Sequence, residues 1–119
     1  MKKRLLSFKY AGQGIRTLFK TQPNARIHLF VLLLVVGTGT SLSISTTEWL
    51  ILILTFGIVL MAEAFNTALE FLTDLASPEP HPLAGKAKDV AAGAVLIAAI
   101  MAVIIGVIIF LPKILEVVI

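Results

Sequence analysis

The chain has 119 residues, of which 58% are hydrophobic and 14% are charged, and its mean hydropathy is +0.99. These values exclude an ordinary soluble globular domain and indicate a membrane protein with room for about three spans. The absence of cysteine excludes a disulfide framework, a thiol nucleophile and a cysteine-ligated zinc site.

The formal net charge of +3 is distributed unevenly along the chain. Seven of the 10 Lys and Arg residues lie within the first 26 positions, whereas every acidic residue lies at position 48 or later. A basic N-terminus next to apolar spans predicts contact with anionic lipid headgroups, and it favours these over nucleic acid as a partner.

The first expected element is an amphipathic helix on the membrane surface, at residues 1–22. Lysines and arginines occupy much of this helix, and its apolar side chains recur near helical spacing. These apolar residues are Leu5, Phe8, Ile15 and Phe19. Pro23 interrupts this helix. Because the first long apolar run begins only near Ile27 and leads straight into further spans, we expect no cleavable signal.

Three transmembrane helices are expected, at residues 27–44, 49–72 and 88–111. The turn "SISTTE" joins the first two, and the segment "SPEPHPLAG" joins the last two because its closely spaced prolines cannot all remain helical. In the third, the uninterrupted apolar residues 90–111 would cover ~33 Å, enough to cross a bilayer core. The fold class is therefore an all-α membrane protein.

The charges outside these spans predict an orientation. The N-terminal segment is rich in Lys and Arg, and the segment 73–89 carries Lys86 and Lys88, whereas the loop between the first two spans has neither Lys nor Arg. Since positive charge is retained on the cytoplasmic side, we expect the N-terminus and residues 73–89 to face the cytoplasm.

The second span carries acidic residues on its cytoplasmic half. Residues 49–62 are uncharged but cover only ~21 Å of a ~30 Å hydrocarbon core, so Glu63 is expected inside or just under the interface. An ionisable side chain there costs at least ~2.5 kcal/mol and predicts a functional site. The polar residues that follow share one helical stripe of about 100° of arc: Glu63, Asn66, Thr67, Glu70 and Asp74.

The spacing along this stripe predicts different roles for its acids. Glu63 and Glu70 lie two turns, or ~10 Å, apart, too far for both to ligate one metal ion directly. Burial favours Glu63 as a general base or proton carrier, whereas Glu70 can be reached by a hydrated cation and a water-soluble substrate. Asn66 can hydrogen-bond either partner. The alternative is a structural polar seam that includes His28 or Arg26, although seams inside lipid favour Ser, Thr and Asn over acids.

A second constellation, "GKAKDVAAGA", opens the third span with Lys86, Lys88 and Asp89. Lys88 could hold a phosphate by charge, and the same lysines also fit simple positive-inside flanking. The sequence has no G-x-x-x-x-G-K-[ST], G-x-G-x-x-G or H-E-x-x-H motif. Any nucleotide would therefore bind without a known soluble nucleotide fold.

The stretch "EAFNTALEFLTDL", followed by "HPLAGKAKDVAAGAVLIAAI", resembles the signature of the small bacterial integral-membrane lipid kinases, the diacylglycerol kinase and undecaprenol kinase family. The patterns E-x-x-N-[ST]-A-x-E-x-x-x-D and A-K-D-x-x-x-x-A-V-L both match, and "SFKYAGQGIRTLFKTQPNARIHL" is similar to the family's N-terminal region. The resemblance implies a homotrimer of three-span subunits in the bacterial inner membrane, with active sites shared near the cytoplasmic face. It also implies magnesium ATP as the phosphoryl donor to a membrane lipid hydroxyl.

The resemblance further implies roles for individual residues. Glu63 corresponds to the catalytic base, with Asn66 beside it, and Glu70 corresponds to a metal ligand. The implied nucleotide-binding residues are Tyr10, Glu70, Glu79, His81, Lys88 and Asp89. The family often has a second metal-binding Glu before the first span, and the matching position here is Gln22, a neutral amide that offers oxygen but no charge.

Two questions stay open at the level of sequence. Undecaprenol and diacylglycerol both present a primary hydroxyl, and only the similarity of "NARIHL" to the Gram-positive-type branch favours undecaprenol; either acceptor places the protein in lipid metabolism, as phospholipid biosynthesis or envelope-precursor recycling. The competing class is a non-enzymatic oligomeric membrane protein that conducts protons or cations or assists assembly. Residues 49–62 are apolar except Thr55, which argues against a conducting path through the second span.

Overall fold

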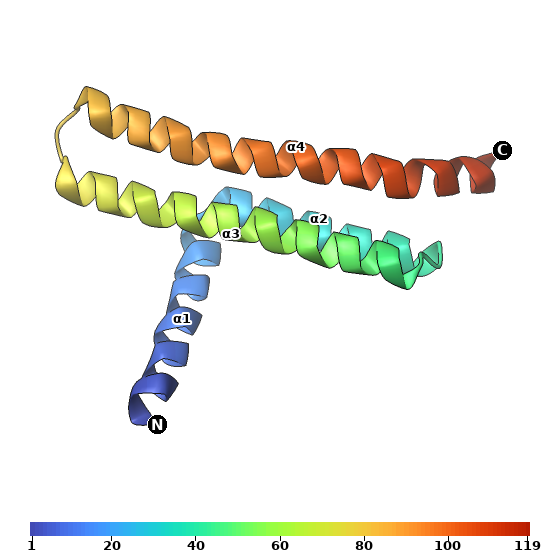
Figure 1. The fold of residues 1–119 in the computed structure, drawn as a ribbon, viewed down its shortest axis with the longest axis horizontal. Helices are drawn as coiled ribbons and strands as arrows, with labels where there is room; N and C mark the ends of the chain where they lie inside the picture. The colour runs from blue at the N-terminus through green and yellow to red at the C-terminus, as the bar shows by residue number, and fades with distance from the viewer.

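A computed structural model describes residues 1–119 as four α-helices and no strand (Figure 1). The helices are α1 (Lys2–Thr21), α2 (Pro23–Ser41), α3 (Thr46–Ala76) and α4 (Pro82–Val118). The last three are long and apolar enough to cross a membrane. The predicted all-α membrane fold, with one N-terminal helix and three spanning helices, is confirmed.

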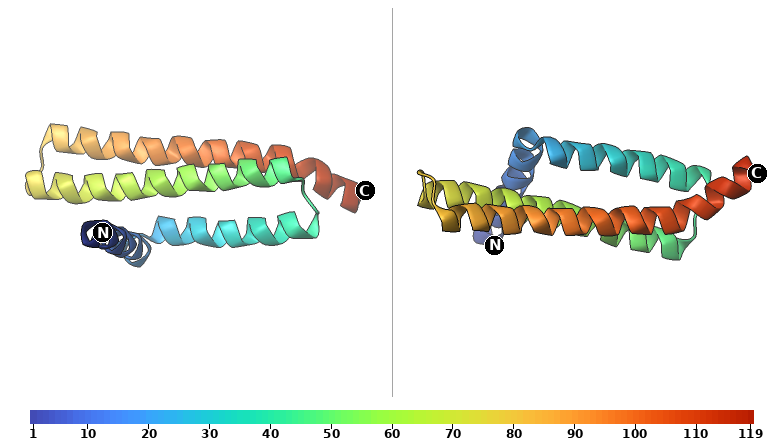
Figure 2. Two further views of the ribbon diagram at one scale, coloured as in Figure 1. Left: turned by 60° about the horizontal axis from the view of Figure 1, so that its bottom comes forward. Right: turned by 90° about the horizontal axis from the view of Figure 1, so that it is seen from above.

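The helices form an open bundle. α3 and α4 run antiparallel and side by side along most of their length, and α2 lies along α3 while standing apart from α4 (Figures 1 and 2). α1 projects from the start of α2 at a steep angle to the other three helices (Figure 1). This angle suits a helix that lies on the membrane surface while its neighbours cross the membrane.

The link between α3 and α4 is shorter than the predicted segment 73–89, because only residues 77–81 are outside the helices. Pro82 occupies the first turn of α4, where a missing N–H costs nothing and the fixed φ angle suits a helix. His81 caps the helix, since its Nδ1 accepts a hydrogen bond from the Leu83 N–H at 3.1 Å. The short link brings the polar ends of α3 and α4 together.

The link between α2 and α3, residues 42–45, begins earlier than expected because α2 ends at Ser41 rather than near Ile44. Ser43 adopts a positive φ of 51°, which reverses the chain. α3 then begins with a capping box: the Glu48 N–H donates to the Ser45 hydroxyl at 3.1 Å, and the Ser45 N–H donates to the Glu48 carboxylate at 2.9 Å. The predicted turn "SISTTE" is therefore partly helical.

Gly39 allows the close approach of α2 to α3 near this link. A Cβ atom at this position would lie 2.8 Å from the Trp49 ring and 3.0 Å from Ile44. We expect Gly39→Ala to destabilise the protein by about 1–3 kcal/mol, because a rigid indole ring cannot yield easily. Thermal unfolding in detergent measures this loss as a lower Tm.

Gly37→Ala on the same helix is the matched control, because a Cβ at Gly37 meets no atom within 4 Å. Helix propensity predicts an unchanged or slightly higher Tm for this variant. Equal Tm values for the two variants would contradict the packing assigned to Gly39.

Candidate functional site

Glu63 is the most deeply buried charged residue, with only 1% of its surface exposed. It lies on α3 and faces α2, where His28 Nε2 is 3.3 Å from its Oε1 atom. No N–H or O–H group is aligned with this Oε1 as a hydrogen-bond donor. A buried carboxylate whose acceptor capacity is unused is costly to keep, and such groups gather at functional sites.

Exposure increases along the predicted stripe from Glu63 towards the end of α3. Thr67 is buried and satisfied, because its hydroxyl donates to the Glu63 carbonyl oxygen at 2.8 Å. Asn66 donates from Nδ2 to Glu70 Oε1 at 3.4 Å, which leaves its buried Oδ1 without a donor. Glu70 is half-buried and Asp74 is exposed. The stripe therefore offers oxygen ligands at several depths.

A polar pocket of about 340 Å³ lies beyond the stripe, where α3, the 77–81 link and α4 meet. One of its 10 lining residues is hydrophobic. The lining consists of Thr73, Asp74, Ser77, Pro78, Glu79, Pro80, His81, Ala84, Gly85 and Lys88. The Lys88 ammonium pairs with the Asp74 carboxylate across this pocket. Since the acidic and basic groups face open solvent, the pocket is suited to a charged, water-soluble ligand.

The sequence did not predict the pair between Asp74 and Lys88, which joins the stripe to the start of α4. The opposite charges are 14 residues apart, one on each side of the proline-rich link, a signal that could have indicated the contact. Glu79 and His81 line the same pocket as Lys88.

Three predicted site residues lie outside both the stripe on α3 and this pocket. Tyr10 is exposed on α1, Asp89 is exposed next to Lys88, and the Gln22 amide donates to the Thr21 hydroxyl at 3.3 Å at the start of α2. Within the single chain, no three Asp, Glu or His side chains gather around one point.

The oxygen ligands on α3 nevertheless fit a magnesium ion. Mg²⁺ is usually held by one or two carboxylates, and waters and substrate phosphates complete its shell. Glu70 supplies a half-buried carboxylate, and the adjacent Asn66 Oδ1 is a carbonyl oxygen that lacks a donor. These two residues would hold the ion.

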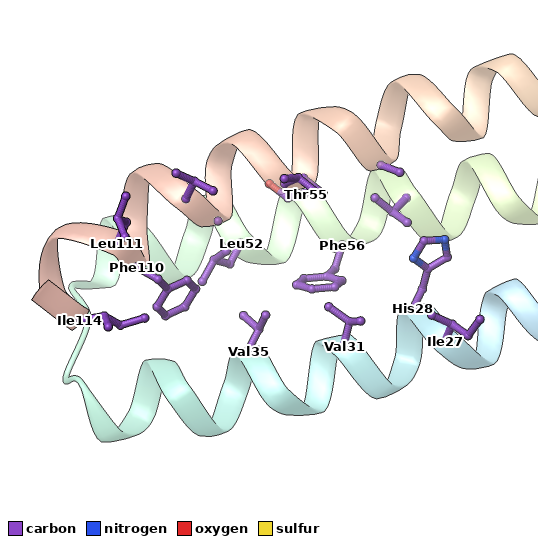
Figure 3. Close-up of a pocket in the computed structure, with 16 residues that line it drawn as sticks. Ile27, His28, Val31, Val35, Leu52, Thr55, Phe56, Phe110, Leu111 and Ile114 are labelled. Carbon is purple, nitrogen blue, oxygen red and sulfur yellow. The ribbon is translucent and has the colours of Figure 1, made fainter. Parts of the chain in front are cut away.

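An apolar groove of about 540 Å³ separates α2 from α3 and α4 (Figure 3). Its walls are almost entirely hydrophobic, with Val31, Phe56 and Phe110 pointing into it, and it runs from Ile114 to His28 (Figure 3). His28 is its single titratable lining residue. The groove therefore ends at the residue that contacts Glu63.

The fold and site define a small three-span membrane protein in which the buried Glu63 lies on α3 and a polar pocket opens at the adjacent ends of α3 and α4. The chain belongs to the prokaryotic diacylglycerol kinase family, whose model matches residues 9–110. This confirms the family predicted from the two motifs.

Individual relatives support the same assignment. The chain is 42% identical to the undecaprenol kinase of Bacillus subtilis, over 90% of this chain and 87% of that protein. It is 44% identical to the diacylglycerol kinase of Synechocystis, over 94% of this chain and 65% of that longer protein. It is also 34% identical to the diacylglycerol kinase of Escherichia coli K12, over 80% and 78% of the two chains.

Proposed function

We propose that the protein is a membrane lipid kinase that transfers the γ-phosphoryl group of magnesium ATP to the hydroxyl of a membrane lipid alcohol. The observation that supports this function most strongly is the separation of the site by depth. Glu63 is buried within the bundle, whereas the pocket that contains Lys88 opens at the ends of α3 and α4. The lipid hydroxyl would reach the buried Glu63, and the soluble nucleotide would enter the open pocket that contains Lys88.

In this mechanism, Glu63 accepts the proton of the lipid hydroxyl while the hydroxyl oxygen forms a bond to the γ-phosphorus. The bond between that phosphorus and the β–γ bridging oxygen breaks, and ADP leaves with the bridging oxygen. Most of the catalysis of phosphoryl transfer comes from positioning and charge stabilisation, with the base near the attacking hydroxyl. No donor is aligned with Oε1 in this arrangement, so the Glu63 carboxylate keeps acceptor sites, of which one oxygen can take this proton.

The nucleotide would bind on the cytoplasmic side of Glu63. Bound Mg²⁺ supplies positive charge to the phosphates, and Glu70 with Asn66 would hold it, joined by the neutral Gln22 amide as a weaker ligand. Lys88, already held at the pocket by Asp74, would contact phosphate oxygens. The remaining proposed nucleotide contacts are Tyr10, Glu79, His81 and Asp89.

The proposal includes the membrane context. The N-terminus and the 77–81 link would face the cytoplasm of a bacterial inner membrane, and α1 would lie on anionic headgroups through its Lys and Arg residues. We also propose a homotrimer with shared active sites. The positions of Tyr10, Gln22 and Asp89 support it, because these proposed site residues lie outside the stripe and the pocket of their own chain and a neighbouring subunit could bring them to a shared site.

The competing function, proton or cation conduction, finds no continuous polar path along α3. Among residues 50–62 of α3, Thr55 is the one polar side chain, and its hydroxyl donates back to the Ile51 carbonyl oxygen at 2.7 Å. The arrangement of α3 therefore favours chemistry at one end of the bundle over transport through it.

Transfer of labelled phosphate tests the proposed function. Purified protein would be incubated with γ-labelled ATP, Mg²⁺ and vesicles that contain either undecaprenol or diacylglycerol. We expect labelled lipid in the organic phase, with the higher kcat/KM for undecaprenol. A preference for diacylglycerol would overturn the choice of acceptor alone, whereas no labelled lipid from folded protein that binds ATP would refute the kinase function.

A further inference from the structure

His28 and Glu63 form the one close contact between titratable side chains of α2 and α3. Their Nε2 and Oε1 atoms are 3.3 Å apart, and the two side chains are 21% and 2% exposed. The ring is therefore close enough to donate from Nε2 after a small rotation, although its N–H is not aligned with Oε1 in this arrangement. Sequence reasoning named His28 merely as a member of a structural seam.

The surroundings leave His28 without a charged competitor for this contact. The α4 side chains that line the groove beside it are uncharged. On α3, Thr67 bonds to the backbone and Glu70 lies two turns away, paired with Asn66. From α1, Leu18 is buried and the charged Lys20 is exposed. Glu63 has no other basic partner within ion-pair distance.

We propose that His28 is a positioning residue for Glu63. When the ring donates from Nε2 to Oε1, it fixes the rotation of the carboxylate, and the second oxygen, Oε2, is left to accept the proton of the lipid hydroxyl. A ring held by one hydrogen bond can impose this orientation because a carboxylate has several acceptor sites. His28 also ends the apolar groove, so a hydrocarbon tail in the groove would carry its hydroxyl towards the pair.

This inference rests on the proposed kinase function, and its test compares His28→Leu with His28→Gln in the full-length protein. Leu removes the donor and keeps an apolar volume, whereas Gln keeps a side-chain N–H. We expect His28→Leu to lower kcat for lipid phosphorylation about tenfold, the effect of losing one hydrogen bond to a charged group, with the KM for ATP unchanged. His28→Gln should recover a substantial part of this loss.

A double variant separates positioning from a general structural role. If His28 acts through Glu63, adding His28→Leu to Glu63→Gln should cause no further fall in kcat. Phe30→Leu, on the exposed side of the same helix, is the matched control and should retain wild-type kcat. If His28→Leu does not fold, His28→Gln in the same two backgrounds provides the comparison, with a smaller expected loss in the wild-type background alone.

Three outcomes would overturn the assignment: wild-type kcat in the folded His28 variant, a loss restricted to the KM for ATP, or a further full loss in the Glu63→Gln background. These outcomes leave the kinase function intact, because they presuppose lipid phosphorylation by the wild-type protein. Failure of the wild-type protein to phosphorylate lipid would instead refute the proposed function itself.

Discussion

Glu63→Gln is expected to lower kcat for lipid phosphorylation by about 10²- to 10⁴-fold, the usual contribution of a general base. The amide keeps the shape of the side chain but cannot accept the hydroxyl proton. ATP binding should be unchanged, because Glu63 is buried within the bundle and is not part of the polar pocket. Steady-state kinetics and equilibrium ATP binding measure the two quantities separately.

The matched control for this substitution is Glu116→Gln, which makes the same chemical change at an exposed position near the end of α4. Wild-type kcat is expected for this variant. If Glu63→Gln abolished ATP binding, the assignment of the lipid hydroxyl to Glu63 and of the nucleotide to the polar pocket would be wrong, because Glu63 would then contribute to nucleotide binding.

Glu70→Gln is expected to raise the Mg²⁺ concentration for half-maximal activity by at least about tenfold, because it removes the charged ligand proposed for the ion. The substitution is mild in shape, since a Gln carbonyl oxygen can still accept the hydrogen bond from Asn66 Nδ2. The measurement is a Mg²⁺ titration of lipid phosphorylation at fixed ATP.

Glu116→Gln again provides the control, and its Mg²⁺ titration should match that of the wild-type protein. A lower kcat for Glu70→Gln with an unchanged Mg²⁺ requirement would exclude Glu70 as a metal ligand. In that case, the charge of Glu70 would serve a step other than metal binding, because Gln keeps the hydrogen bond with Asn66.

The fold was largely predictable because long apolar runs specify spanning helices with little ambiguity. The helix ends were harder to place. α3 continues to Ala76, past the predicted span 49–72, and α4 begins at Pro82, before the predicted span 88–111. Hydropathy marks where a helix meets lipid, whereas capping marks where it ends. The His81 cap and the reversal at Ser43 depend on backbone geometry that composition does not show.

Within the candidate site, helical spacing predicted the stripe on α3 but not its partners on other helices. The contact of His28 with Glu63 depends on which face of α2 packs against α3, and the apolar sequence around His28 presents no single preferred face. The pair between Lys88 and Asp74 depends on the length of the 77–81 link. Such contacts between helices arise from packing, so the spacing within one helix could not predict them.

The most direct test of the account is the stoichiometry of the reaction in defined vesicles that contain a lipid alcohol. Purified protein with Mg²⁺ and ATP should form one lipid phosphate for each ADP, and Glu63→Gln should lower both products together. ADP without lipid phosphate, or vesicles in which neither product forms although the protein is folded and binds ATP, would contradict a lipid kinase built on Glu63.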